Sequence, residues 1–184
     1  MTTSNRTQVS VKKTRIIGID PGSRCTGYGV IDSDGFRHEY ITSGFVKITG
    51  DELPERLGMI FSEISEIIEK WQPQSMGIEQ VFVNKNVDSA LKLGQARGAA
   101  ICAGTNANLD VGEYTPRAIK KAVVGIGSAD KEQIQQMMKL LLKLDFVPQS
   151  DEADGLAIAV CHANHMHVKS LGIVTKVRGG RWRS

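Results

Sequence analysis

The stretch Arg15–Asp20, with the sequence RIIGID, is followed directly by Pro21 and Gly22. An isoleucine-rich run of this length is typical of a buried strand, and the acidic residue and the Pro-Gly pair mark its end. Residues 27–32 and 36–47 also have the composition of strands, and Ser33-Asp34-Gly35 between them is a hairpin-turn signal. We therefore expect the first three strands to form an antiparallel meander.

Helices and strands alternate after this meander. Residues 51–71 predict an amphipathic helix with Pro54 near its first position. The apolar residues of this helix recur at three- and four-residue steps: Leu57, Phe61, Ile64, Ile68 and Trp71. Residues 75–80 predict a short strand, which should lie parallel to the first strand because a helix connects them.

A second helix is predicted over residues 88–107, with Asp88 as a possible N-cap. Its small residues, among them Gly94 and Gly98, allow another backbone to approach closely. One more strand and three helices follow, over about residues 110–114, 116–124, 130–144 and 151–165. This order predicts an α/β fold with a mixed five-stranded sheet and helices on both faces, compatible with a ribonuclease-H-like fold. Periodicity alone does not fix the topology.

The size and composition are those of one compact domain, with 184 residues of which 41% are hydrophobic. We assign residues 15–167 to this domain, residues 1–14 to a flexible leader and residues 168–184 to a basic tail. No apolar run is long enough to span a membrane, and the leader lacks the apolar centre of a signal peptide. These features favour a cytoplasmic protein whose three scattered cysteines are unpaired thiols: Cys25, Cys102 and Cys161.

Positive charge is concentrated locally. The net charge is +3, but both termini are basic and free of acidic residues, so residues 15–167 carry 15 basic against 20 acidic residues. Residues 85–131 nevertheless carry seven basic against four acidic residues. A prediction of nucleic-acid binding therefore depends on this segment and not on the overall charge.

Acidic residues stand where strands and a helix meet. Asp20 and Glu79 each end an apolar strand, and parallel neighbouring strands would present both carboxylates at one edge of the sheet, where open α/β sheets place their sites. Asp151 and Asp154 share a face at the start of a helix. Four clustered carboxylates repel one another unless a divalent cation neutralises them, and oxygen ligands favour Mg²⁺ or Mn²⁺. Two such ions, about 3.5–4 Å apart, can clamp the attacking water and the leaving oxygen of a phosphodiester.

Each of these residues also has a structural explanation. An aspartate before Pro-Gly is usually a turn residue, and Asp151 with Asp154 is equally compatible with a capping box. Glu79 is harder to dismiss, because an acid within an apolar strand is costly to bury without a partner. Residues 151–154, with the sequence DEAD, also match a helicase motif. The chain has no GxxxxGK[ST] phosphate-binding loop, so an ATPase function is not expected. A cysteine and three histidines of the last helix fall on different faces and predict no zinc site: Cys161, His162, His165 and His167.

Four blocks of the sequence resemble the RuvC family of crossover-junction endonucleases. They are residues 17–29, 78–100, 123–131 and 148–159, and the similarity covers nearly all of residues 15–167. The resemblance implies a ribonuclease-H-like homodimer that makes two symmetric nicks in a four-way (Holliday) junction during DNA recombination and repair. It also implies two partner proteins, RuvA and the branch-migration motor RuvB.

The resemblance also implies roles for individual residues. The catalytic and metal-binding carboxylates of the family fall on Asp20, Glu79, Asp151 and Asp154, which would hold two Mg²⁺ ions or Mn²⁺ in their place. The family's aromatic residue that stacks on a base falls on Phe82, and its lysines near the scissile phosphate fall on Lys120 and Lys131. Lys85 and Arg97 are further candidate DNA contacts. Phe82 as a loop anchor and the lysines as solvated side chains are the alternatives that stay open.

Three other functions are compatible with parts of the sequence. A nuclease of the same fold could act on RNA or an RNA–DNA hybrid, and a scaffold could bind junctions without cutting them. The Gly18-Ile19-Asp20 turn also resembles the first phosphate loop of sugar-kinase-like ATP-binding proteins, but these need two lobes. For the basic tail, which includes Arg178, Arg181, Trp182 and Arg183, a solubilising role is favoured over contact with DNA.

Overall fold

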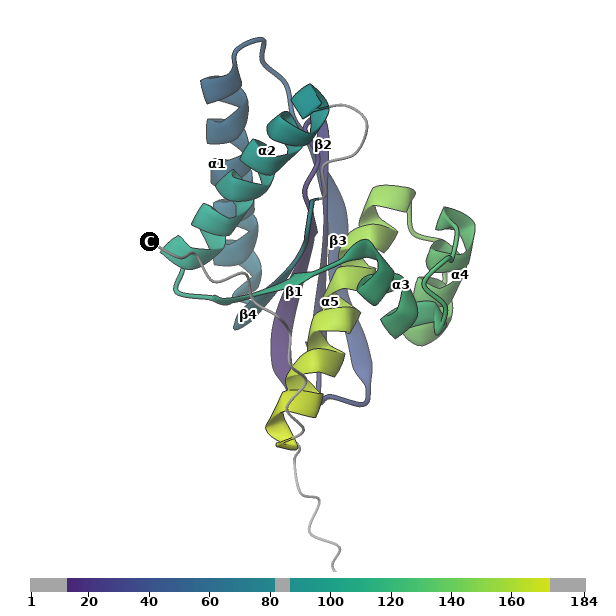
Figure 1. Cartoon of the computed structure of the whole chain (residues 1–184). Coiled ribbons are helices and arrows are strands. Elements are labelled where there is room, and N and C mark those ends of the chain that lie inside the picture. The colour runs from purple at the N-terminus through teal and green to yellow at the C-terminus, as the bar shows by residue number, and fades with distance from the viewer. Residues whose placement is uncertain (1–12, 82–86, 173–184) are drawn as a thin grey trace, which may run out of the picture.

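The computed structural model describes residues 13–81 and 87–172. Five strands form one sheet in the order β3-β2-β1-β4-β5 (Figure 1). The strands are β1 (Thr14–Asp20), β2 (Cys25–Ser33), β3 (His38–Lys47), β4 (Ser75–Glu79) and β5 (Asp110–Tyr114). The first three pair antiparallel, whereas β4 pairs parallel to β1 and β5 pairs parallel to β4. The predicted meander and the mixed five-stranded sheet are both confirmed.

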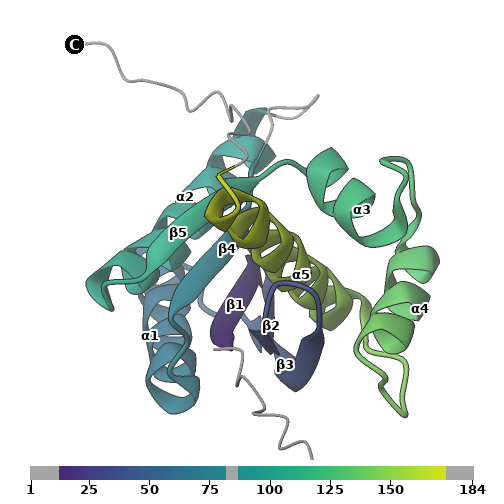
Figure 2. The ribbon, with the colours of Figure 1, turned by 90° about the horizontal axis from the view of Figure 1, so that it is seen from below.

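Helices cover both faces of this sheet (Figures 1 and 2). Helices α1 (Leu53–Trp71) and α2 (Val87–Asn106) pack on one face, and α5 (Ser150–Ser170) crosses the other. The short helices α3 (Pro116–Val124) and α4 (Lys131–Leu141) pack beside α5. Side chains of β1 alternate between the two cores, because Ile17 and Ile19 pack on the α1–α2 side and Ile16 on the α5 side.

Helix α5 lies unusually close to the sheet because glycines face one another across the contact. A Cβ atom built on Gly18 of β1 would lie 2.2 Å from the carbonyl oxygen of Gly155. A Cβ atom on Gly155 would lie 2.5 Å from the carbonyl carbon of Tyr28. This backbone-to-backbone contact sets the distance between α5 and the sheet. It thereby brings the first turn of α5 to the carboxyl end of β1.

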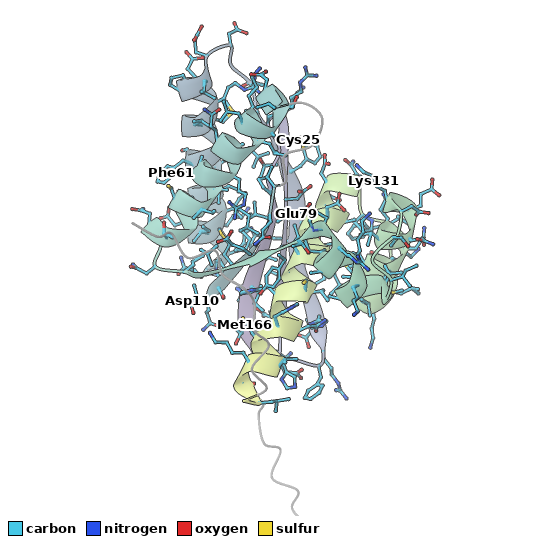
Figure 3. All side chains as sticks on the ribbon, viewed as in Figure 1. Cys25, Phe61, Glu79, Asp110, Lys131 and Met166 are labelled. Atoms are coloured by element: carbon cyan, nitrogen blue, oxygen red, sulfur yellow. The ribbon has the colours of Figure 1, made fainter. Side chains whose placement is uncertain are left out.

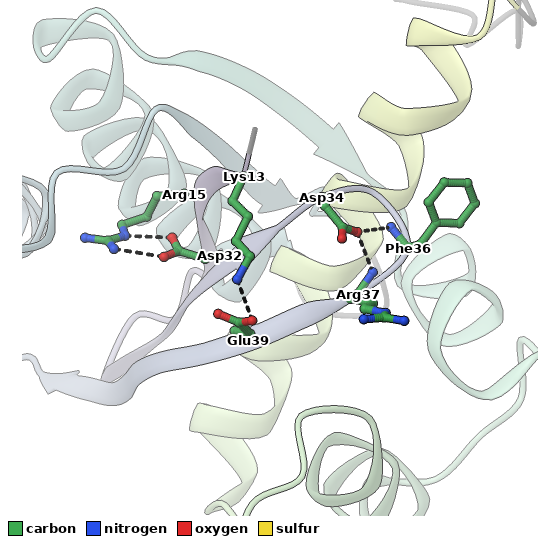
Figure 4. A network of polar contacts seen from close by, with 7 residues as sticks. All are labelled: Lys13, Arg15, Asp32, Asp34, Phe36, Arg37 and Glu39. Carbon is green, nitrogen blue, oxygen red and sulfur yellow. Dashed lines mark hydrogen bonds and ion pairs between the residues drawn. The ribbon is translucent and has the colours of Figure 1, made fainter. Parts of the chain in front are cut away.

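Polar contacts hold the start of β1 and the β2–β3 hairpin (Figure 4). Arg15 donates to both carboxylate oxygens of Asp32, at 2.8 and 2.9 Å, and to the carbonyl oxygen of Trp71 at 3.1 Å. The carboxylate of Asp34 accepts from the backbone N–H groups of Phe36 and Arg37, which closes the predicted turn.

Several details differ from the sequence prediction. Phe61 is exposed, and Ile60 takes its predicted place in the buried row of α1. Asp88 lies inside the first turn of α2 and pairs with Lys92, so it is not the N-cap. Helix α4 ends at Leu141 because Lys143 adopts a left-handed conformation, and α5 continues to Ser170, five residues beyond the expected end. Among the described helices, none is both long and apolar enough to cross a membrane.

Candidate active site

Two parallel strands place Asp20 and Glu79 side by side at one edge of the sheet. Ile19 pairs with Ile78 in the register of β1 and β4, so the next residues, Asp20 and Glu79, leave the sheet together. Both isoleucines are fully buried on the α1–α2 side. Because strand side chains alternate, the two carboxylates face α5.

The first turns of α5 bring acidic residues to the same place. Asp154 lines a pocket of about 250 Å³ with Asp20 and Glu79. Asp151 lies at the margin, where its carboxylate accepts a hydrogen bond from the Cys25 thiol at 3.0 Å. The capping alternative is wrong for these two aspartates, because the carboxylate of Glu152 accepts from the N-cap, Gln149, at 3.0 Å. Their oxygens are therefore not used by the helix cap.

Two lysines from different helices complete the wall of this pocket. Lys120 of α3 and Lys131 at the start of α4 line it together with the carboxylates (Figure 3 labels Glu79, Cys25 and Lys131). The capping of both helices fixes these positions: the Thr115 hydroxyl accepts from Ala118 at 3.1 Å, and the Asp130 carboxylate accepts from Gln133 at 2.8 Å. The structure thus brings together five of the residues that the sequence singled out.

The remaining predicted contacts lie elsewhere. Phe82 and Lys85 fall outside the described residues. Arg97 of α2 donates to the backbone carbonyl of Glu79 at 2.9 Å and forms an ion pair with Glu113. Its guanidinium is thus bound to groups of the protein itself.

Burial and mutual repulsion disfavour ionisation of the clustered carboxylates. Burial raises the pKa of Asp20 to about 8, and the charges of Glu79, Asp154 and Asp151 add to this shift while Lys131 opposes it. Burial and Asp154 raise the pKa of Glu79 to about 7, against the effect of Lys120. The pKa of Asp154 is raised mainly by burial, and both lysines oppose that shift. The two lysines do not balance the acidic charge.

This donor set fits a hard divalent cation. All four candidate ligands offer carboxylate oxygens, which Mg²⁺ and Mn²⁺ prefer, and a cation would relieve the mutual repulsion of the clustered carboxylates. Among the described residues, no three Asp, Glu, His or Cys side chains are close enough to form a ready-made ligand set. Asp20, Glu79 and Asp154 would hold the cation across the pocket, and Asp151 would contribute from its margin.

The raised pKa values predict how stability depends on pH in protein stripped of divalent ions. Folded Asp20 and Glu79 retain protons that the unfolded chain, with pKa values near 4, has already released. The stability that these two groups contribute is therefore fully present below about pH 4 and is lost as pH rises towards 8. We expect this contribution to the free energy of unfolding, measured with urea in chelator, to fall by about 1.4 kcal/mol for each unit by which a folded pKa exceeds its unfolded value.

A control separates these carboxylates from other titrating groups. Asp20→Asn should flatten the slope of stability against pH. In the wild-type protein, added Mg²⁺ should restore the stability that is lost at pH 8. A wild-type slope that is unchanged in Asp20→Asn would show that the repulsion is unimportant.

Sequence reasoning missed two contacts between the sheet and α5. The contact between Cys25 and Asp151 joins residues 126 positions apart, and no local pattern signals it. His162 is buried between sheet and helix, with Nε2 2.6 Å from the Ser75 hydroxyl and Nδ1 2.7 Å from the Tyr114 hydroxyl. Burial lowers its pKa to about 4, so the ring is neutral.

A pair of strand glycines makes room for this ring. Gly77 and Gly112 pair across β4 and β5, and a Cβ atom on either would contact His162 at 2.9 or 2.6 Å. The two glycines at strand centres were a sequence signal for a side chain inserted from the opposite layer. His165 turns back on its own helix, where its Nδ1 lies 2.8 Å from the carbonyl oxygen of Cys161.

Comparison with known proteins identifies the family of this chain. The family model for "Crossover junction endodeoxyribonuclease RuvC" matches residues 16–162. The chain belongs to the RuvC family. A RuvC from Psychromonas ingrahamii is 56% identical over 170 residues, which cover 91% of this chain and 98% of that protein. A RuvC from Vibrio cholerae is 54% identical with the same coverage.

Solved RuvC structures share the fold. Thermus thermophilus RuvC superimposes with a TM-score of 0.75 at 31% identity, covering 86% of this chain and 97% of that one. The same RuvC in complex with a Holliday junction substrate gives a TM-score of 0.79, covering 87% and 97%. The ribonuclease-H-like α/β fold expected for this RuvC-family chain is thereby confirmed, as is the predicted family resemblance.

Proposed function

We propose that this RuvC-family protein resolves four-way DNA junctions by symmetric paired nicking, in homologous recombination and DNA repair. The observation that carries the proposal is the pocket in which Asp20, Glu79 and Asp154 face two lysines. Buried acids beside basic side chains suit a cation-dependent phosphodiesterase. The curated relatives are named crossover junction endodeoxyribonucleases, and one solved relative is bound to a Holliday junction.

Membership of this nuclease family implies dependence on a divalent metal. We propose Mg²⁺ as that metal, two ions per site, with Mn²⁺ able to substitute. Asp20, Glu79, Asp151 and Asp154 would hold them. When bound, such a pair activates water and stabilises the leaving oxygen of a phosphodiester.

The protein's own residues position the DNA. Lys120 and Lys131 would contact the oxygens of the scissile phosphate and offset its charge, since they already lie beside the carboxylates. Phe82 would stack on a base near the junction centre, a contact worth about 1–3 kcal/mol. Lys85 would contact the DNA backbone.

A twofold dimer suits a substrate with approximate twofold symmetry and two strands to cut. We propose that the outer surface of α2 contributes to this dimer. Ala96, Ala100 and Ala103 are buried within the subunit, but a Cβ atom on Gly94 or Gly98 would meet open space. Only the outer part of the small-residue helix is therefore available to another chain. RuvA and RuvB are proposed partners, and action on cellular DNA would place the enzyme in the cytoplasm.

Cleavage of defined substrates tests this function. Incubation with a synthetic four-way junction and Mg²⁺ should give paired nicks in strands of like polarity, and chelator should abolish them. A linear duplex and an RNA–DNA hybrid should be largely spared. Equal cutting of the hybrid would favour the ribonuclease alternative, and junction binding without cutting in Mg²⁺ would favour a scaffold.

Each pocket lysine should contribute to the rate. We expect Lys131→Ala and Lys120→Ala to lower the single-turnover cutting rate on the order of 10-fold to 100-fold, because each removes a cation beside the reacting phosphate. Lys139→Ala, at the other end of α4, is the matched control and should keep the wild-type rate. Equal rates for Lys131→Ala and Lys139→Ala would show that Lys131 is a solvated helix residue.

A further inference from the structure

Arg97 reaches the catalytic strand from the opposite face of the sheet. Its Nε donates to the backbone carbonyl of Glu79 at 2.9 Å, and its terminal nitrogen pairs with the carboxylate of Glu113. The Arg97 side chain is only 19% exposed, whereas that of Glu113 is 49% exposed. One guanidinium therefore connects α2, β4 and β5 at the point where Glu79 leaves the sheet.

The centre of β4 pairs with both β1 and β5, whereas its last residue pairs with β5 alone. The register between β1 and β4 ends with Ile19 and Ile78, so Glu79 lies beyond the last paired residue of β1. On its other side Glu79 pairs with Tyr114 of β5, and Gln80 donates to the Tyr114 carbonyl at 2.7 Å. Arg97 adds a charged donor to the main chain of the residue whose carboxylate enters the pocket.

The alternation of β5 shows which face Arg97 occupies. Gly112 and Tyr114 face α5, because both contact His162. Glu113 between them therefore faces α2, where Arg97 meets it. The carboxylate of Glu79 lies on the α5 side with Asp154. Arg97 thus holds the strand from behind the pocket.

We infer that Arg97 is a positioning residue that fixes the Glu79 main chain, with Glu113 as its anchor, and that it is not a phosphate contact. The inference rests on the proposed function of Glu79 as a metal ligand. A planar guanidinium can donate to a carbonyl and a carboxylate at once, which a lysine ammonium does not reproduce in the same geometry. Loss of a partner that orients a metal ligand typically costs about 10-fold to 100-fold in metal affinity or activity.

The two roles of Arg97 predict opposite effects of changing Glu113. If Arg97 positions Glu79, Glu113→Gln weakens its anchor and lowers the cutting rate in the same direction as Arg97→Gln. If Arg97 contacts phosphate, Glu113→Gln frees the guanidinium and tightens junction binding. Loss of one phosphate contact would also reduce the slope of log affinity against log salt by about one.

Arg15 offers a matched control within the same sheet. It also bridges a carboxylate, Asp32, and a backbone carbonyl, that of Trp71, and its side chain is 34% exposed. It lies near the start of β1, at the opposite end of the strand from Asp20. Arg15→Gln should therefore lose about as much stability as Arg97→Gln without affecting the pocket.

The experiment compares Arg97→Gln, Arg97→Lys, Glu113→Gln and Arg15→Gln at a temperature at which all four are folded. Mn²⁺ binding is measured by calorimetry without DNA, junction affinity in chelator over a salt series, and cutting by single turnover in Mg²⁺. We expect the Arg97 and Glu113 variants to bind Mn²⁺ and cut about 10-fold to 100-fold more weakly, with junction affinity within twofold and an unchanged salt slope. Arg15→Gln should match the wild type in all three.

Several results would overturn the inference. They are junction binding weakened tenfold with a shallower salt slope in Arg97→Gln, full function in Arg97→Lys, tighter junction binding in Glu113→Gln, or an equal loss in Arg15→Gln. Wild-type protein that binds Mn²⁺ but cuts no junction would contradict only the proposed function. The inference on Arg97 would still be tested by the calorimetric comparison of Mn²⁺ binding.

Discussion

Asp20→Asn is expected to abolish junction cutting, with a loss of rate on the order of 10³-fold or more, while junction binding in chelator is retained. Burial raises the pKa of Asp20, and the charges of Glu79 and of the two aspartates of α5 raise it further. Asparagine keeps the shape of the side chain but removes the negative charge that a bridging cation requires. The measurement is single-turnover cleavage of a labelled four-way junction in Mg²⁺, with affinity determined separately in chelator.

The same substitution should stabilise the metal-free protein at pH 8, because it removes a buried charge that its neighbours repel. Loss of activity together with a gain in stability excludes unfolding as the cause. Asp51→Asn, at an exposed aspartate before α1, is the control and should cut normally. Wild-type cutting by Asp20→Asn would show that Asp20 is only a turn residue before Pro21.

Gly18→Ala is expected to cost about 3 kcal/mol or more of unfolding free energy, at the upper end of the range for overpacking a core. A Cβ atom at this position would lie 2.2 Å from the Gly155 carbonyl oxygen and 2.3 Å from the Ala159 nitrogen. Both neighbours are backbone atoms, so no side chain can rotate away. Relief requires α5 to move off the sheet, which would also carry Asp151 and Asp154 away from Asp20.

Urea unfolding measures this effect, and Gly58→Ala provides the control. Gly58 is exposed on α1, and a Cβ atom there would meet nothing within 4 Å. That substitution should stabilise the protein by about 0.5–1 kcal/mol through helix propensity. A cost below about 1 kcal/mol for Gly18→Ala would mean that overpacking here is readily relieved and that the glycines do not set the distance between α5 and the sheet.

Local patterns predicted the strands and helices because their signals lie within single segments. The isoleucine run before Asp20, the Pro54 and Pro116 helix starts and the Ser33-Asp34-Gly35 turn all appear in the structure. The convergence of Asp20 with Glu79 followed from one topological step, the parallel pairing of strands joined by a helix. Asp151 and Asp154 had an equally good local explanation as a cap, which only the structure removed.

Tertiary contacts explain what the sequence did not reveal. The charge of Arg97 favoured a DNA contact, but its partners are a backbone carbonyl 18 residues earlier and a carboxylate 16 residues later. The neutral state of His162 depends on its burial between the sheet and α5. Phe61 and Ile60 are adjacent in α1, and the packing of the helix against the sheet decides which of them is buried. Such choices depend on the packing partner and not on the segment itself.

The central claim is that carboxylates from β1, β4 and α5 share divalent cations. Anomalous diffraction from crystals of this protein soaked in Mn²⁺ tests it most directly. We predict Mn²⁺ peaks within ligand distance of Asp20, Glu79 and Asp154, which disappear in crystals of Asp20→Asn. Peaks confined to other residues, or a pocket without Mn²⁺ at saturating concentration, would contradict it.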